Sequence, residues 1–214
     1  MLATFLSSFI IGFTGAASPG PLLVVTMSET MAVGLLAPLL LITGHSILEL
    51  GVTAGLNTGV STLAQNPAFR SGFFVVGGAV MLFLAFMTIR ESLGKSRGPS
   101  ASKASGGSGA RNWARLLGLG VVVSVMNPYW TFWWLTIGTG QIAKAQVAGP
   151  GHVAAFYSGH ILSDYVWYIA VGAMVVFGRN LLKGRAYRWM MAGLGIALGG
   201  FGLLFLVEGI TRAP

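Results

Sequence analysis

Charged residues are scarce in this chain of 214 amino acids. They make up 8% of it, whereas a soluble domain typically carries about 25%. A soluble fold this poor in charge would lack the residues needed to cover its surface. Cysteine is absent, which excludes disulfides and thiol chemistry. Hydrophobic residues instead account for 54% of the sequence, and they fall in long runs.

The apolar runs are long enough to cross a bilayer, which takes about 20 residues in a helix. They lack the alternation of a β-barrel, so the predicted fold is an all-α integral membrane protein. The first run has neither a basic leader nor a cleavage motif, and we interpret it as a retained helix. About six transmembrane helices are predicted, covering approximately residues 2–28, 31–57, 71–90, 115–141, 152–178 and 188–210.

Basic residues are distributed unevenly between the connecting loops. Ten of the 13 lysines and arginines surround the central loop or precede the last span. Loops rich in Lys and Arg face the cytosol, so the placement of the basic residues indicates the orientation of the chain. The net charge of +8 is therefore not interpreted as a sign of nucleic-acid binding. We predict a multi-pass protein of the plasma (inner) membrane, with the central loop cytosolic and both termini outside.

The central loop also divides the chain into two similar halves. Residues 94–112 are rich in Gly, Ser and basic residues and predict a flexible linker between residues 1–93 and 113–214. The second span of each half carries Gly-His and then an acid, at an offset of 115 residues. With three spans each, the halves must insert in opposite orientations. Two inverted three-helix repeats are typical of secondary transporters.

Proline interrupts the first span of each half and predicts a helix that stops and restarts. Ser18 and Asn127 suit the N-cap of each restarted helix. The new N-termini would present free backbone N–H groups to a substrate carboxylate, although a simple kink is the alternative. The predicted substrate-binding residues are Ser18, Pro19, Gly20, Pro21, Asn127, Pro128, Tyr129 and Trp130.

Ionisable residues inside the second span of each half form two matched pairs. His45 precedes Glu49 by four residues, and His160 precedes Asp164 by the same distance, so each pair shares a helix face. A charge at this depth costs at least about 2.5–3.5 kcal/mol, which favours a function in proton coupling or cation binding over structural pairing. Because the spans run in opposite directions, Glu49 is predicted toward the outside and Asp164 toward the inside.

The same four residues leave two other functions open. Histidine and carboxylate ligands suit zinc or manganese, so His45, Glu49, His160 and Asp164 could serve a divalent-metal transporter. An intramembrane enzyme is the weaker alternative, because the sequence contains neither G-x-S-x-G nor H-E-x-x-H. We therefore predict no enzymatic activity, no cofactor and no resident metal.

Several glycines recur at intervals of four residues. Gly51, Gly55 and Gly59 form one such ridge, and Gly195 and Gly199 form another. Small residues at this spacing allow helices to approach closely, so both ridges are predicted to pack against a neighbouring helix.

Together these motifs resemble the lysine-exporter (LysE/RhtB) family over nearly the whole chain. The residues that carry the resemblance are Ser18–Pro21, Gly44 to Leu56, Asn127-Pro128 and Gly159 to Asp164. Many members have Gly-Asp where this chain has Gly44-His45, and a lysine in place of Tyr129. The resemblance implies proton-driven export of an amino acid or similar zwitterion. The expected partners are a small-molecule substrate, the lipid bilayer and possibly a second copy of the chain.

The predicted orientation can be tested with a single introduced cysteine. Because the chain has none of its own, Ser105→Cys in the central linker would be the only site for an impermeant maleimide. We expect labelling only after the cells are opened, since the linker is predicted to be cytosolic. Labelling in intact cells would reverse the orientation.

Overall fold

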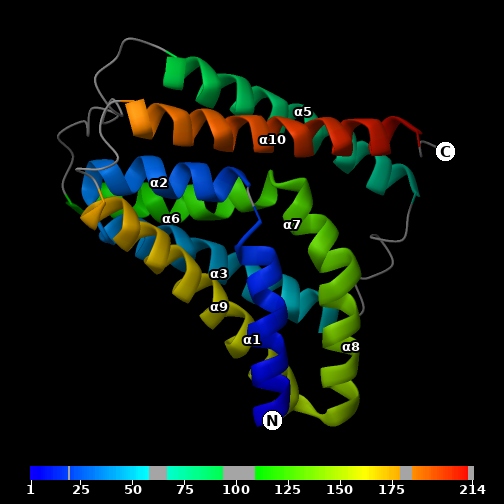
Figure 1. Ribbon diagram of the computed structural model, residues 1–214. Coiled ribbons are helices and arrows are strands. Elements are labelled where there is room, and N and C mark those ends of the chain that lie inside the picture. The colour runs from blue at the N-terminus through cyan, green and yellow to red at the C-terminus, as the bar shows by residue number, and fades with distance from the viewer. Residues whose placement is uncertain (19, 58–66, 94–108, 179–184, 212–214) are drawn as a thin grey trace.

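A computed structural model describes residues 1–18, 20–57, 67–93, 109–178 and 185–211 of the chain. All elements in these ranges are helices (Figure 1). Most of the predicted linker, residues 94–108, lies outside the described ranges, as does Pro19. The predicted all-α class is confirmed for the described part of the chain.

The first and fourth predicted spans are both broken at their proline motifs. Helix α1 (Leu2–Ala16) is followed by α2 (Pro21–Val33) at an angle of 80°. Helix α6 (Gly109–Val125) is followed by α7 (Pro128–Trp133), and the chain bends by 63° between them. A π-helical turn (Trp134–Gly138) joins α7 to α8 (Thr139–Ala148). The predicted breaks are therefore confirmed.

Four longer helices run without a break. They are α3 (Leu36–Asn57), α5 (Pro67–Leu93), α9 (Pro150–Phe177) and α10 (Arg185–Thr211). In the described residues, three helices are long and apolar enough to cross a membrane, or up to five if each bent pair counts as one span. Helix α5 adds a shorter apolar stretch, Phe74–Arg90. The chain is a multi-pass membrane protein.

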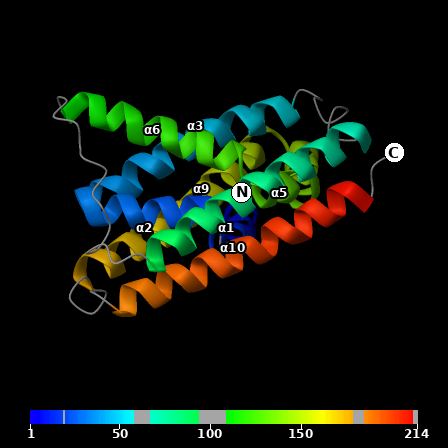
Figure 2. The same cartoon turned by 90° about the horizontal axis from the view of Figure 1, so that it is seen from above.

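Helices of one half of the chain pack mainly against helices of the other half, which we call exchanged packing. Helix α1 of the first half lies against α9 of the second, and α6 of the second lies against α3 of the first. Helices α5 and α10 pack side by side and form a separate layer next to α2 (Figures 1 and 2). This arrangement leaves α3 and α9 in contact at the centre.

Several helices end or begin at one end of the molecule. Helices α2, α5 and α9 end there, and α3, α6 and α10 begin there (Figures 1 and 2). We call it the basic end, because the described helices carry these residues near it: Arg90, Arg115, Arg185 and Arg188. The N-terminus lies away from the basic end (Figure 1). There, the Thr4 hydroxyl is 2.7 Å from Nδ1 of His152 at the start of α9.

Small residues allow the exchanged helices to approach closely. Gly44 on α3 lies against the carbonyl of Leu117 on α6. Gly159, the residue that corresponds to Gly44 in the second half, lies against the carbonyl of Phe5 on α1. A side chain at either glycine would overlap backbone atoms of the neighbouring helix. Corresponding glycines thus make corresponding contacts.

The predicted glycine ridges have different outcomes. Gly195 and Gly199 on α10 pack against Ala85 of α5, as predicted. The prediction for α3 fails at Gly51, because an added Cβ there would meet no other described atom within 4 Å, and Gly59 lies outside the described residues. Helix α3 makes its close contact through Gly44 instead, on the turn nearest α6.

Alanine at Gly44 should destabilise the fold. Its Cβ would overlap the Leu117 carbonyl, and overpacking of this kind costs about 1–3 kcal/mol. Gly51→Ala on the same helix is the matched control, where the open space predicts a neutral effect or a gain of about 0.5–1 kcal/mol. Thermal unfolding in detergent measures both. Equal melting of the two variants would refute the close α3–α6 contact.

Candidate functional site

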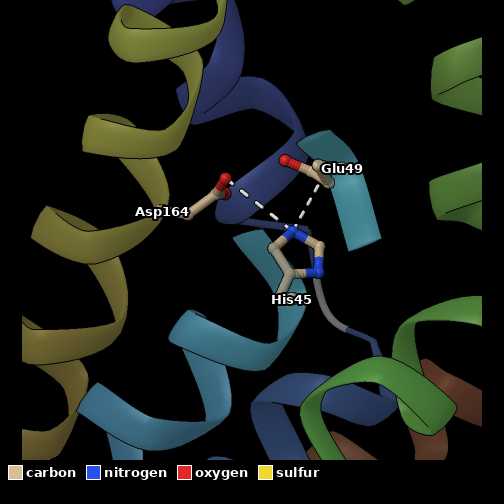
Figure 3. Close-up of side chains that lie close together, drawn as sticks. All are labelled: His45, Glu49 and Asp164. Carbon is tan, nitrogen blue, oxygen red and sulfur yellow. Dashed lines mark ion pairs between the residues drawn. The ribbon is translucent and has the colours of Figure 1, made fainter. Parts of the chain in front are cut away.

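Four ionisable side chains meet at the contact between α3 and α9. His45 Nε2 lies 3.0 Å from Glu49 Oε1, and His160 Nε2 lies 3.1 Å from Glu49 Oε2. Asp164 Oδ2 is farther away, at 3.8 Å from His45 Nε2 and 3.9 Å from His160 Nε2. Figure 3 shows His45 directed at both carboxylates. All four residues are buried.

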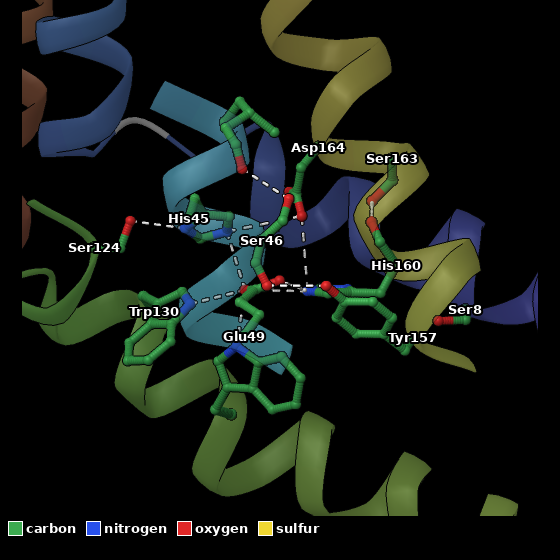
Figure 4. A network of polar contacts seen from close by, with 12 residues as sticks. Ser8, His45, Ser46, Glu49, Ser124, Trp130, Tyr157, His160, Ser163 and Asp164 are labelled. Carbon is green, nitrogen blue, oxygen red and sulfur yellow. Dashed lines mark hydrogen bonds and ion pairs between the residues drawn. The ribbon is translucent and has the colours of Figure 1, made fainter. Parts of the chain in front are cut away.

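Glu49 lies at the centre of this cluster and also accepts hydrogen bonds from two tryptophans. The indole N–H groups of Trp130 and Trp134 donate to Oε1, at 2.8 Å and 2.9 Å (Figure 4). The two tryptophans are four residues apart and share one face of the segment that follows the second break. With both histidines nearby, Glu49 receives its donors from three helical segments, which fits an ionised carboxylate.

His45 is held in one tautomer by Ser124 of α6. The Ser124 hydroxyl donates its only hydrogen to the Gly120 carbonyl at 2.6 Å. Its oxygen must therefore accept from His45 Nδ1, 2.7 Å away. Since Nδ1 carries a hydrogen, Nε2 is the nitrogen that shares a proton with Glu49. Ser124 thus fixes both the ring orientation and the donor of this pair.

His160 has a different environment, although it corresponds to His45 in the other half. Its ring stacks on Trp133 with centroids 4.5 Å apart. No described residue accepts or donates a hydrogen bond at its Nδ1. The nearest position on the neighbouring helix is Gly12, which has no side chain to offer. The two halves therefore place their histidines together but bond them differently.

Asp164 is the least constrained member of the cluster. Its Oδ2 is buried without a hydrogen-bond partner among the described residues. Glu49 and Asp164 both approach the same two histidines, so the two pairs form one cluster where α3 and α9 meet. The placement of Glu49 toward the outside and of Asp164 toward the inside stays a prediction.

A pocket adjoins the cluster and reaches the second helix break. Its volume is about 40 Å³, which is room for a few water molecules. The walls include all four cluster residues together with Asn127, Tyr129, Trp130 and Tyr168. Single ligand atoms of His45, Glu49 and Asp164 lie within 4.8 Å of one another, which is close enough to surround a cation.

The two helix breaks face each other at this pocket. A Cβ on Gly20 would lie 3.0 Å from the amide nitrogen of Asn127. Asn127 caps α7 as predicted, by accepting a hydrogen bond from the Tyr129 N–H at 3.1 Å. The N-cap predicted at Ser18 is wrong, because Gly20 occupies that position and the Ser18 hydroxyl donates to the Thr14 carbonyl.

Two further predicted binding residues, Pro21 and Pro128, lie at the breaks and do not line the pocket. Pro21 is buried at the first position of α2, and Pro128 packs against Gly77 of α5. The Tyr129 hydroxyl donates to the Thr14 carbonyl at 3.3 Å and so connects α7 to α1. Pro19 lies outside the described residues.

Two residues of the site, Ser124 and Trp134, do not belong to any of the motifs that the two halves share. Ser124 is the single hydroxyl residue in the apolar part of α6, and Trp134 belongs to an aromatic run that is also typical of a membrane interface. Their position deep within a predicted span is the signal that could have identified them, because contact with lipid at that depth needs neither a serine nor a tryptophan.

The described helices form a multi-pass membrane protein with a buried polar site between its two halves. The family model described as LysE type translocator matches residues 13–209. The chain therefore belongs to this translocator family, as its motifs predicted. No curated protein and no solved structure matches the chain.

Removal of the Ser124 hydroxyl should change the hydrogen bonding of His45 without unfolding the protein. Ser124→Ala deprives His45 Nδ1 of its acceptor, and a hydrogen bond to a charged group is worth about 1.5–3 kcal/mol. We expect a shift in the His45 ring nitrogen signals by NMR. Ser163→Ala is the matched control in the second half, because its hydroxyl bonds only the His160 carbonyl. Unchanged His45 signals in Ser124→Ala would contradict the assigned hydrogen bond.

Proposed function

We propose that this protein is a secondary active transporter that exports an amino acid or similar small zwitterion in exchange for protons. The observation that carries the proposal is the buried Asp164 carboxylate, which adjoins a pocket, has an oxygen without a hydrogen bond from the described chain, and lies no closer than 3.8 Å to either histidine nitrogen. A carboxylate in the membrane interior is costly unless a cation neutralises it. A proton and a substrate ammonium group are two cations that can do so in turn.

The two ends of a zwitterion have complementary surroundings in the pocket. The ammonium group would lie at Asp164, near the aromatic rings of Trp130 and Tyr168. The carboxylate would lie at the helix breaks, where the N-termini of α2 and the segment after Pro128 carry partial positive charge. The approach of Gly20 to Asn127 supports this placement, because it puts both N-termini beside one pocket.

The exchanged packing supports an inverted-repeat mechanism. Gly44 and Gly159 make equivalent contacts with α6 and α1. In the same manner, Gly120 lies against the Leu41 carbonyl, and the Ser8 hydroxyl donates to the Phe156 carbonyl at 2.6 Å. Two halves built this way can rock about a central site to open it alternately to each side.

The basic end supports the proposed orientation in the membrane. Four arginines of the described helices gather at this end, as positive residues do on the cytosolic side. Export would then carry the substrate from the basic end to the opposite one. In this orientation both termini face outward from the plasma membrane.

The two carboxylates have different tasks in this proposal. Glu49 is fixed by two indoles and two histidines, so it organises the site. Asp164 exchanges its cation, because it has the weaker contacts with the histidines. A proton would enter from outside, occupy Asp164 while the empty protein returns inward, and leave when the next substrate binds.

A divalent-metal transporter is the second candidate function. It is favoured by the 4.8 Å grouping of ligand atoms from His45, Glu49 and Asp164, which are ligands suited to zinc or manganese. The metal would then be the cargo. Proteoliposome assays with labelled amino acids, zinc and manganese separate this candidate from the first, because each predicts a different transported species.

Substitution of Asp164 tests the coupling proposal. Asp164→Asn should reduce export driven by a pH gradient at least about tenfold, while exchange of labelled for unlabelled substrate continues. Glu49→Gln should reduce both activities, because it disturbs the group that holds His45 and Trp130 in place. Glu208→Gln on α10, a carboxylate outside the pocket, is the control. Full pH-driven export by Asp164→Asn would refute the assigned role.

A further inference from the structure

We infer that the inner half of the translocation path runs along one face of α2, past Thr26 and Thr30, and that the Glu29–Arg115 ion pair closes it at the basic end. This inference rests on the proposed transport function. It adds residues that lie outside the pocket, and it states where the solute enters.

The Glu29–Arg115 pair joins the two broken spans. Arg115 Nη1 and Nη2 donate to the two carboxylate oxygens of Glu29, with the first bond 2.9 Å long. Glu29 is on α2 and Arg115 is on α6, so the pair connects the two halves directly. Two parallel bonds give it a defined geometry that a single contact would lack.

Two buried hydroxyls lie between this pair and the pocket. Thr26 is 0% exposed and Thr30 is 2% exposed, yet neither hydroxyl has a hydrogen-bond partner among the described residues. Thr43 and Thr88 donate to the carbonyl four residues earlier, whereas Thr53 and Thr131 also lack a partner in the described chain but lie on other helices. A buried hydroxyl without a partner costs about 1–3 kcal/mol. This cost indicates that water or a polar solute satisfies Thr26 and Thr30 in another state.

The threonines continue from the wall of the pocket. Leu22 lines the pocket, and Thr26 and Thr30 follow it at intervals of four residues on the same face of α2. Each step is about 6 Å along the helix axis. This face lies between Glu29, which contacts α6, and Leu23 and Met27, which pack with residues of α3 and α9. It therefore faces the interior of the helix bundle.

The ion pair and the threonines together describe a closed entrance. When α2 and α6 are held together by Glu29 and Arg115, the face with the threonines is buried. Separation of the two helices would break the pair and hydrate both hydroxyls. The same movement would open a route from the basic end to Leu22 and the pocket.

Cysteine accessibility tests this inference without any transport assay. Thr26→Cys and Thr30→Cys are the only thiols in their variants, and each is combined with native Glu29 or with Glu29→Gln. The probe is a small charged methanethiosulfonate reagent added to proteoliposomes from the side of the basic end. The control is Thr88→Cys on α5, a buried threonine that is hydrogen-bonded within its own helix.

We expect Glu29→Gln to accelerate labelling of Thr30→Cys about tenfold, the change that 1.4 kcal/mol produces. Thr26→Cys should accelerate too but react more slowly, because it lies one turn deeper. Thr88→Cys should remain unlabelled. Unchanged rates at both threonines would overturn the inference, as would equal acceleration of Thr88→Cys, which would indicate general loosening. Since labelling does not need a substrate, these results stand even if the proposed cargo is wrong.

Discussion

The buried Glu49 carboxylate is the group on which the rest of this structure depends. A charge in the membrane interior needs partners, and Glu49 obtains them from α3 itself, from α9 and from the segment after the second helix break. These donors can reach it only if the fourth span bends. The break at Asn127 is part of the same constraint, because Trp130 and Trp134 lie on the segment that follows the 63° bend.

The residues of the cluster are related by the repeat, but their hydrogen bonds are not. Each half contributes a histidine and an acid at the same spacing. Ser124 then orients His45, whereas Gly12 leaves the Nδ1 atom of His160 without a bond in the described chain. The two histidines therefore differ in their bonds because of two small side chains. The two carboxylates differ for another reason, since only Glu49 receives the indole bonds of Trp130 and Trp134.

Much of this architecture could be predicted from the sequence, because its signals are local. Proline fixes the places where a helix must break, and a charged residue within an apolar run indicates a buried site. Both predictions agree with the structure. The N-cap prediction at Ser18 is wrong because the sequence does not show that Gly20 takes the extended conformation there. The meeting of both His/acid pairs in one cluster could not be predicted, because it depends on how α3 and α9 pack against each other.

The asymmetry of the pocket has a reason in the proposed substrate. An inverted repeat tends to present the same groups to both ends of whatever it binds, yet a zwitterion has one anionic and one cationic end. A site with two equivalent acids would bind its ammonium group in two orientations. Two indoles hold Glu49 Oε1, and His160 Nε2 lies 3.1 Å from Oε2, so Glu49 is fixed in one orientation. In the proposed mechanism Asp164, whose contacts with the histidines are 3.8 Å and 3.9 Å long, is the acid that takes the cation, and the helix breaks provide the positive end.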